Sequence, residues 1–241
     1  MKPDVLITWP SGCDYPLSRF QLTAFKDFFN KVIITFYPHG SPDFRGFIKK
    51  THPEWIFCES PENSVPWRER AVNIGLEQSK SDWVLFTEQD FFWKDDAFLH
   101  QVIAATKLYD IVGINQGSRL HPCFLLTKRS LIDQTSRDFS VQGQNLDHFS
   151  KFSQEILKLG KFVDLKDLNL FSGRDWYHMS SLTWNLFRVK DLTPHEFHYL
   201  ADFLVYNSYS RTARVPLDPR WTALTHMTES LLSGFGKFLN D

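Results

Sequence analysis

The sequence predicts one α/β domain built on a mostly parallel sheet, and three observations support this prediction. Short apolar runs alternate with segments of helical spacing through the first half of the chain. Turn-forming Pro, Gly, Asn and Ser residues separate these runs. The length of 241 residues is enough for one large domain. Such alternation is typical of a parallel sheet with helices on both faces, a Rossmann-like arrangement.

Six strands are expected, each a short run of apolar, β-branched or aromatic residues, and residues 162–187 contain further short strand-like pieces. They cover residues 5–9, 31–37, 55–58, 83–87, 110–114 and 123–127. Helices are expected around 20–29, after Pro66, from Asp95 or Asp96, over 149–159 with Gly160 as C-cap, and from a capping box at 193–196. We expect residues 1–190 to form the catalytic domain and residues 191–241 a helical extension packed on it.

Composition excludes some classes of function. The chain has 27 basic and 28 acidic residues, so it lacks the basic excess of a nucleic-acid-binding domain. Its three cysteines match neither a disulfide framework nor a zinc motif, which favours a reducing, cytoplasmic location. The first apolar run is too short for a signal peptide, and no run approaches the roughly 20 apolar residues of a membrane span. Residues 227–239 are the segment available for peripheral contact with a membrane, but its charged residues Glu229 and Lys237 favour docking onto its own domain.

The triplet Glu88-Gln89-Asp90 directly follows an apolar strand. Carboxylates at the end of a buried strand repel each other and lose hydration unless a cation neutralises them. Mg2+ and Mn2+ bind one or two carboxylates together with the phosphate oxygens of a substrate. The triplet therefore predicts a site where a metal ion holds a diphosphate. A solvated turn after the strand is the alternative.

The motif Arg68-x-Arg70-Ala71-x-Asn73-x-Gly75, followed by a strand that ends in Glu88-Gln89-Asp90, resembles the nucleotide-sugar half of GT-A fold glycosyltransferases. The inverting, family-2-like enzymes are the most similar. The resemblance covers roughly the first 190 residues in element order. It implies a nucleotide-sugar donor and a divalent metal, Mn2+ or Mg2+.

The resemblance implies that Asp90 binds the metal. Glu88 stands where the family usually has Asp, and Gln89 is neutral where many members carry an acid, which puts the metal requirement in question. A later His often completes the metal site in this fold, and His178 is the best match. The other donor-binding residues implied are Thr8, Trp9, Pro10 and Tyr37 near the base, and Arg68, Arg70 and Asn73 near the phosphates.

On the acceptor side, the resemblance implies that Asp147 is the catalytic base, although the Glu that usually precedes it is absent. A plain helix N-cap is the alternative for Asp147, and Asp138 is the second candidate base. Trp176 and Tyr177, with Trp184, are expected to form the acceptor floor by ring stacking, with core packing as the alternative for at least one of them. The pair His195 and His198 is interpreted as surface.

The predicted activity is an inverting transfer of a sugar to a hydroxyl of a glycan, a lipid-linked acceptor or a small molecule. One alternative is a nucleotidyltransferase, but the turn after the first strand has a single Gly where those enzymes carry a Gly-rich phosphate loop. The other alternative is a non-catalytic descendant that binds sugars or a partner. Gln89 and the missing Glu before Asp147 favour this second alternative.

Overall fold

The computed structural model of the chain describes residues 1–9, 22, 25–36, 42–60, 67–88, 91–117, 119–140 and 149–178. Its strands are β1 (Asp4–Trp9), β2 (Lys31–Phe36), β3 (Ile56–Glu59), β4 (Trp83–Glu88), β5 (Phe91–Trp93), β6 (Ile111–Gln116), β7 (Arg119–Lys128), β8 (Phe162–Asp164) and β9 (Trp176–His178). Its helices are η1 (Lys26–Phe28), α2 (Pro42–Thr51), α3 (Trp67–Gln78), α4 (Asp96–Ala105), α5 (Arg129–Ile132), α6 (Ser150–Ile156) and η2 (Leu165–Leu168).

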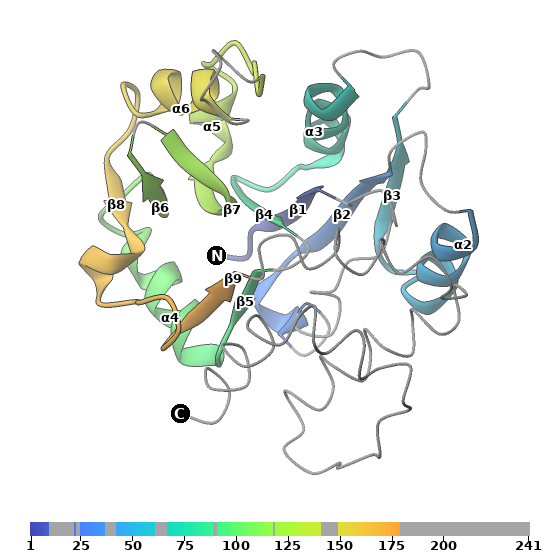
Figure 1. The fold of residues 1–241 in the computed structure, drawn as a ribbon, viewed down its shortest axis with the longest axis horizontal. Helices are drawn as coiled ribbons and strands as arrows, with labels where there is room; N and C mark the ends of the chain where they lie inside the picture. The colour runs from blue at the N-terminus through green and yellow to red at the C-terminus, as the bar shows by residue number, and fades with distance from the viewer. Residues whose placement is uncertain are drawn as a thin grey trace, which may run out of the picture.

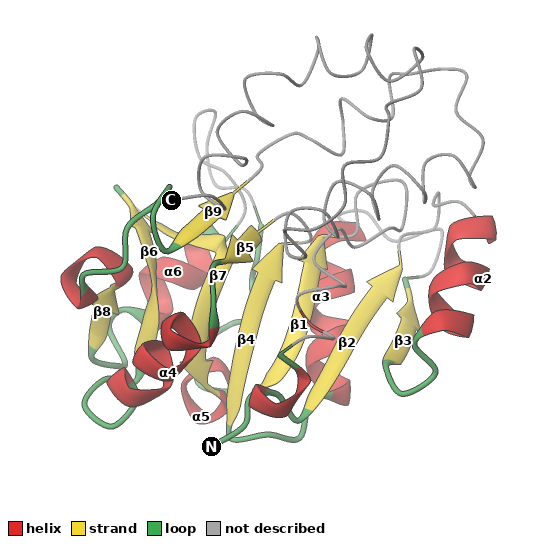
Figure 2. Ribbon diagram, turned by 90° about the horizontal axis from the view of Figure 1, so that it is seen from below, coloured by secondary structure: helices red, strands yellow, loops and turns green. Residues whose placement is uncertain are grey.

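The described strands form a seven-stranded sheet in the order β3-β2-β1-β4-β7-β6-β8 and a separate two-stranded sheet, β5-β9 (Figures 1 and 2). Neighbouring strands pair in parallel except around β7, which runs antiparallel to both β4 and β6. The prediction of a mostly parallel sheet in an α/β fold is therefore confirmed. The reversed direction of β7 was not predicted.

Helices cover both faces of the large sheet (Figure 1). On one face, α3, α5 and α6 contribute to an apolar cluster in which Phe86 of β4 contacts Phe139, Phe149 and Phe152. On the other face, α4 and the small sheet pack over β1, β2 and β4 in a second cluster that contains Trp93. Burial of these large side chains is the main driving force for a fold of this kind.

Local sequence signals explain the start of α4 and the close packing of α3. The Asp95 side chain accepts a hydrogen bond from the Phe98 backbone N–H (3.2 Å), so the predicted N-cap of α4 is confirmed. In α3, Ala71 is buried, and a Cβ on Gly75 would lie 3.1 Å from the Thr35 hydroxyl. Two small residues of the motif in α3 thus serve close packing of the helix on the sheet.

Other expectations were wrong. Gly160 is not the C-cap of α6, because the helix ends at Ile156 with Leu157 in the cap position. Helix α2 was not predicted from the sequence. The described part of the expected helix at 20–29 is Leu22 and the short 3-10 helix η1. The extension at 191–241 lies outside the described residues and stays a prediction.

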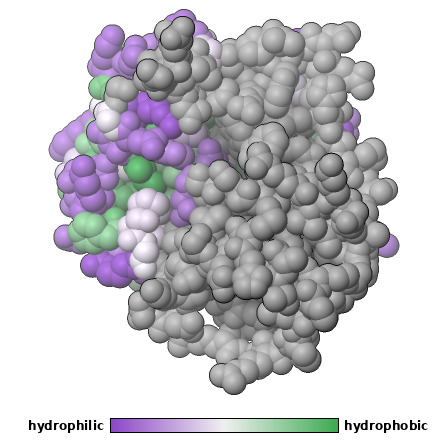
Figure 3. Space-filling view, viewed as in Figure 1, coloured by the Kyte–Doolittle hydropathy of each residue, from purple (hydrophilic) through white to green (hydrophobic). Residues whose placement is uncertain are grey.

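The described surface gives no sign of a membrane span. None of the described helices is both long and apolar enough to cross a bilayer. Where Figure 3 colours the surface, most of it is hydrophilic, with small hydrophobic areas in between. The cytoplasmic location and the membrane contact at 227–239 stay predictions from the sequence.

Candidate functional site at the carboxyl end of β4

The strand directions bring four polar side chains together at one edge of the large sheet. Strand β4 ends at Glu88, and β7, which runs the opposite way, begins at this same edge. Because Thr87 pairs with Phe124, one further step along the two strands reaches Glu88 and Cys123. In open α/β sheets, ligands bind at the carboxyl ends of the parallel strands.

The small sheet adds a residue from much later in the chain. Strand β5 starts at Phe91, just after the triplet, and pairs antiparallel with β9 so that Phe91 lies opposite His178. The ring of Phe91 also lies 6.5 Å from that of His178, centroid to centroid. The pairing thereby fixes His178 beside the end of β4.

His178 and Glu88 are in direct contact. Nε2 of the imidazole lies 2.8 Å from Oε2 of the carboxylate, and each side chain is 17% exposed. An ionised carboxylate only accepts hydrogen bonds, so Nε2 carries the proton of this contact. Nδ1 is then the ring nitrogen with a lone pair when the imidazole is neutral. The structure thus places the predicted metal ligand His178 next to the first acid of the triplet.

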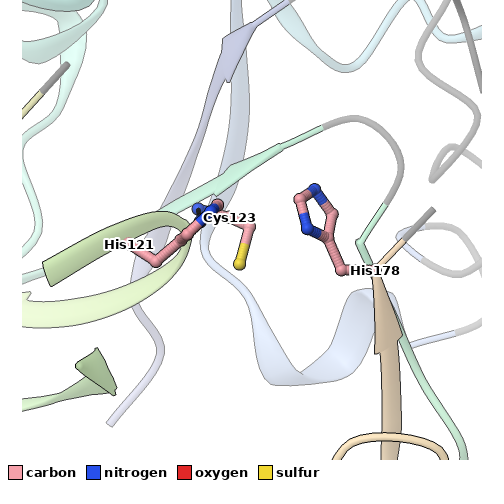
Figure 4. A group of neighbouring side chains, drawn as sticks. All are labelled: His121, Cys123 and His178. Atoms are coloured by element: carbon pink, nitrogen blue, oxygen red, sulfur yellow. Dashed lines mark hydrogen bonds between the residues drawn. The ribbon is translucent and has the colours of Figure 1, made fainter. Parts of the chain in front are cut away.

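Two further candidate ligands lie beside His178 (Figure 4). One ligand atom from each of His121, Cys123 and His178 lies within 4.8 Å of the others. The Cys123 side chain is buried, at 2% exposure, and both imidazoles are half-buried. The rings of His121 and His178 meet edge to face with centroids 5.2 Å apart. Nδ1 of His121 accepts a hydrogen bond from the Cys123 backbone N–H (3.1 Å).

Sequence reasoning did not find His121 or Cys123 as site residues. Cys123 was one of three scattered thiols, and the strand was expected to begin at residue 123. The signal was the spacing His121-Pro122-Cys123 at the start of a long strand. That spacing indicates a ligand pair only in combination with the start of β7 beside the end of β4.

The predicted phosphate-binding residues lie on α3. Arg70 is exposed, and the structure describes the backbone of Arg68 but not its side chain. Asn73 donates a hydrogen bond from Nδ2 to the Arg137 carbonyl (3.1 Å), while its buried Oδ1 has no hydrogen-bond partner among the described residues. Asn73 therefore holds α3 against the segment before α6, a role that the sequence did not predict.

The predicted acceptor-binding residues Trp176 and Tyr177 are neighbours in β9. Trp176 is half-buried and stacks on Phe91, with centroids 5.3 Å apart and an interplanar angle of 27°. Its indole N–H faces the Leu170 carbonyl at 3.4 Å. These contacts show a packing role for Trp176, whereas its role in the acceptor floor stays a prediction. Tyr177 is described only through its backbone pairing with Phe92.

Asp138, the second candidate base, has strong partners. Lys151 Nζ lies 2.6 Å from Oδ2, and the Ser140 backbone N–H donates to Oδ1 (3.0 Å). The hydrogen bond from Lys151, followed by that from Ser140, lowers the pKa of the Asp138 carboxyl from its usual value. A carboxylate with a lowered pKa is a weaker proton acceptor. The geometry thus makes Asp138 a structural link between the segment before α6 and α6 itself.

Several predicted site residues cannot be placed. For Thr8 and Trp9 the structure describes the backbone in β1 and not the side chain. Pro10, Tyr37, Gln89, Asp90, Asp147, Trp184, His195 and His198 lie outside the described residues. Their roles stay predictions.

Comparison with known proteins identifies the fold but does not identify the function. No family model matches the sequence, and no curated protein matches it. Among solved structures, residues 1–349 of S. aureus TarS match with a TM-score of 0.51 and 14% identity, over 100% of this chain and 88% of that one.

Two other solved structures resemble the chain less well. The mannosyltransferase PcManGT from Pyrobaculum calidifontis, in complex with GDP-Man and Mn2+, matches with a TM-score of 0.49 and 14% identity over 100% of this chain and 85% of that one. The bifunctional IspDF from Campylobacter jejuni matches with a TM-score of 0.45 and 15% identity over 68% of this chain, which spans only 48% of that protein. At 14% identity the match to TarS shows the fold alone, and this fold is of the GT-A type.

Proposed function

We propose that the protein transfers a sugar from a nucleotide-diphosphate donor to an acceptor hydroxyl. The observation that carries the proposal is the contact between Glu88 and His178 at the carboxyl end of β4 in a sheet of the GT-A type. An acid and an imidazole at this edge suit a metal–diphosphate site, because ligands of such sheets bind there. Fold alone does not fix the reaction, so the residues of this site carry the proposal.

The donor side of the proposal uses a cation and two arginines. Asp90, two residues after the end of β4 in the sequence, and His178 are the proposed ligands of Mn2+ or Mg2+. The ion neutralises the diphosphate as the bond from the sugar to the phosphate breaks. Arg68 and Arg70 are the proposed partners of the phosphate oxygens, since the guanidinium group matches them with two parallel N–H donors. Asn73 supports them by fixing α3.

The acceptor side of the proposal uses a base. Asp147 is proposed to remove the proton of the acceptor hydroxyl while its oxygen attacks the anomeric carbon from the face opposite the leaving diphosphate. One displacement of this kind inverts the configuration of the sugar. The Asp138 carboxylate, tied to Lys151, is less suited to the same task because its pKa is lowered. The acceptor is proposed to be a glycan, a lipid-linked sugar or a small molecule.

Calorimetric titration of the full chain with UDP, GDP, CDP and TDP tests this proposal. Each nucleotide is titrated once with Mn2+ and once with EDTA. We expect one nucleotide to bind tightly in Mn2+ and at least tenfold more weakly in EDTA, and we expect Asp90→Ala to bind it equally weakly in both. Asp96→Ala is the matched control, because Asp96 is an exposed acid of the first turn of α4 that caps nothing.

The outcomes separate the proposal from its rivals. Failure of all four diphosphates to bind in Mn2+ would overturn the transferase proposal and favour a non-catalytic descendant of the fold. Preference for a nucleoside triphosphate over every diphosphate, measured in the same titrations with the four triphosphates added, would instead indicate a nucleotidyltransferase.

A further inference from the structure

We propose that His121, Cys123 and His178 bind a transition metal ion of borderline softness, of which Zn2+ is the representative. The inference concerns a site beside the proposed diphosphate site and stands without that proposal. Its ligand atoms come from the third and fifth residues of β7 and the last residue of β9, two strands of different sheets. An ion there would join the small sheet to the large one next to the end of β4.

The distances between the three ligand atoms are close to those around a bound zinc ion. Zinc bonds to nitrogen and sulfur at about 2.0–2.1 and 2.3 Å, so ligand atoms on one tetrahedral ion lie roughly 3.3–3.6 Å apart. The three ligand atoms here lie within 4.8 Å of one another. Rotations of the side chains that move each atom by about 1 Å are therefore enough to close the site. Three protein ligands leave the fourth position for water.

Glu88 prepares His178 for this role. Its carboxylate accepts the hydrogen bond from Nε2, 2.8 Å away, which fixes the tautomer and leaves the lone pair on Nδ1. Ligating histidines are typically oriented in this way by a carboxylate on the other ring nitrogen. Figure 4 shows the Cys123 sulfur between the two imidazoles, on the side to which His178 turns one nitrogen. Glu88 is thus a positioning residue of the site.

To bind the ion, Nδ1 of His121 has to leave the backbone N–H group of Cys123. Its Nδ1 accepts a hydrogen bond from the Cys123 backbone N–H at 3.1 Å. Ligation through Nδ1 replaces the hydrogen bond from the Cys123 backbone N–H with a bond to the ion, and no change of tautomer is required. The Cys123 thiol gives up its proton on binding, since a coordinating thiol is deprotonated. Binding releases the thiol proton to solvent and takes the His121 Nδ1 acceptor away from the Cys123 backbone N–H.

The ligand chemistry separates this ion from the one proposed for the diphosphate. Imidazole and thiolate favour Zn2+ and similar ions, whereas Mg2+ and Mn2+ favour oxygen ligands. With Nε2 on Glu88, His178 has one lone pair to give, and the nitrogen–sulfur site uses it. Asp90 and the phosphate oxygens then serve the harder ion without His178. This assignment refines the role of His178 in the proposed function.

The first test is spectroscopic and needs no nucleotide. The full chain is treated with EDTA, desalted under reducing conditions and titrated with Co2+, which shows a near-ultraviolet charge-transfer band only when a thiolate binds it. We expect one equivalent of Co2+ to give this band and one equivalent of Zn2+ to remove it. The double variant Cys13→Ser/Cys58→Ser retains Cys123 as the only cysteine of the chain and is expected to keep the band. Absence of the band in this variant would overturn the inference.

The second test assigns the ligands. Cys123→Ser is expected to lose the band and to bind Zn2+ at least tenfold more weakly, measured by competition with a chromogenic chelator. His121→Ala and His178→Ala are expected to weaken Zn2+ binding to the same extent, whereas Glu88→Gln keeps the band with roughly tenfold weaker binding. Circular dichroism in EDTA checks that each variant folds. Unchanged Zn2+ affinity in a folded Cys123→Ser variant would equally overturn the inference.

An additional variant separates the two metal sites. Asp90→Ala is expected to keep the Co2+ band and the Zn2+ affinity, because Asp90 belongs to the proposed diphosphate site. Loss of nucleotide binding in Asp90→Ala with retention of the band would support both proposals. Loss of the band in Asp90→Ala would show a single shared ion and contradict the separate nitrogen–sulfur site.

Discussion

Nε2 of His178 lies 2.8 Å from Oε2 of Glu88, which joins the last residue of β9 to the last residue of β4. The two residues are far apart in the chain and belong to different sheets. Both side chains are only 17% exposed, so water screens their contact less than it screens an ion pair on the surface. The contact fixes an imidazole at the edge of the sheet where a ligand is expected.

Removing the Glu88 carboxylate should therefore destabilise the protein even without metal. Glu88→Ala leaves the Nε2–H of a mostly buried imidazole without its acceptor, and hydrogen bonds to charged groups contribute about 1.5–3 kcal/mol. We expect the free energy of unfolding to fall by about 1–2 kcal/mol in urea titrations at pH 7 with EDTA.

Glu59→Ala is the matched control for Glu88→Ala. Glu59 also ends a strand, β3, but its ion pair with Lys49 is exposed on both sides. A loss below about 0.5 kcal/mol is expected for this exposed pair. Equal losses in the two variants would contradict a special role for the contact between Glu88 and His178.

Arg70 should matter for nucleotide binding and not for folding. It is exposed on α3, so its side chain contributes little to the buried core. Loss of its charge-assisted hydrogen bonds to a diphosphate is expected to weaken binding by about tenfold in Arg70→Ala, with the unfolding midpoint unchanged. Lys80→Ala is the control, because Lys80 is an exposed cation just beyond the other end of α3. An equal loss in Lys80→Ala would indicate a general charge effect in place of a phosphate contact.

Asp4 stabilises the edge of the sheet opposite the site. Its fully buried carboxylate accepts hydrogen bonds from the Ser79 hydroxyl, the Lys80 and Ser81 backbone N–H groups and the Asn30 side-chain amide, at 2.8–3.0 Å. Asp4→Ala leaves these donors without their acceptor, and we expect a loss of about 3 kcal/mol or more in the free energy of unfolding.

Asp27→Ala serves as the comparison for Asp4→Ala. Asp27 is an exposed acid of η1, so its removal should change the free energy of unfolding by less than about 0.5 kcal/mol. Unfolding in urea at pH 7 measures both variants. A small effect of Asp4→Ala would show that water or neighbouring groups replace its carboxylate.

Acid should weaken the contacts that Asp110 makes. Lys128 Nζ lies 2.5 Å from one carboxylate oxygen, and the Lys161 backbone N–H donates to the other at 3.0 Å. The hydrogen bond from Lys128, followed by that from Lys161, lowers the pKa of Asp110. A lowered pKa in the folded state means stability that is present above the ordinary aspartate pKa of about 3.9 and is lost as the pH falls through the lower folded value.

Asp110→Asn tests this pH dependence. The variant should be less stable than the wild type at pH 7, by on the order of 1 kcal/mol or less because the pair is partly exposed. The difference should shrink below about pH 4 and disappear once Asp110 is protonated. Urea titrations from pH 7 to pH 2.5 measure it. A difference that stays constant across this range would assign the effect to the shape of the side chain and not to its charge.

The sequence by itself determined the elements whose signals are local. Apolar runs predicted the bounds of strands β1 to β4 to within a residue or two. A short strand can be recognised from its own apolar residues and from the turn residues that follow it. Asp95 was predicted as an N-cap of α4, and its side chain accepts the hydrogen bond expected of an N-cap. The acid at the end of β4 and the later histidine were also identified from the sequence as candidate site residues, with the help of a family resemblance.

Tertiary structure alone decided which side chains meet. The direction of β7 depends on pairing with β4 and β6, and no residue within β7 records whether its neighbours run parallel or antiparallel to it. That direction places His121 and Cys123 beside Glu88, while the pairing of β5 with β9 brings in His178. Contacts between residues so far apart in sequence form only when the whole sheet buries its apolar faces, so this cluster of His, Cys and Glu side chains is a property of the fold and not of any one segment.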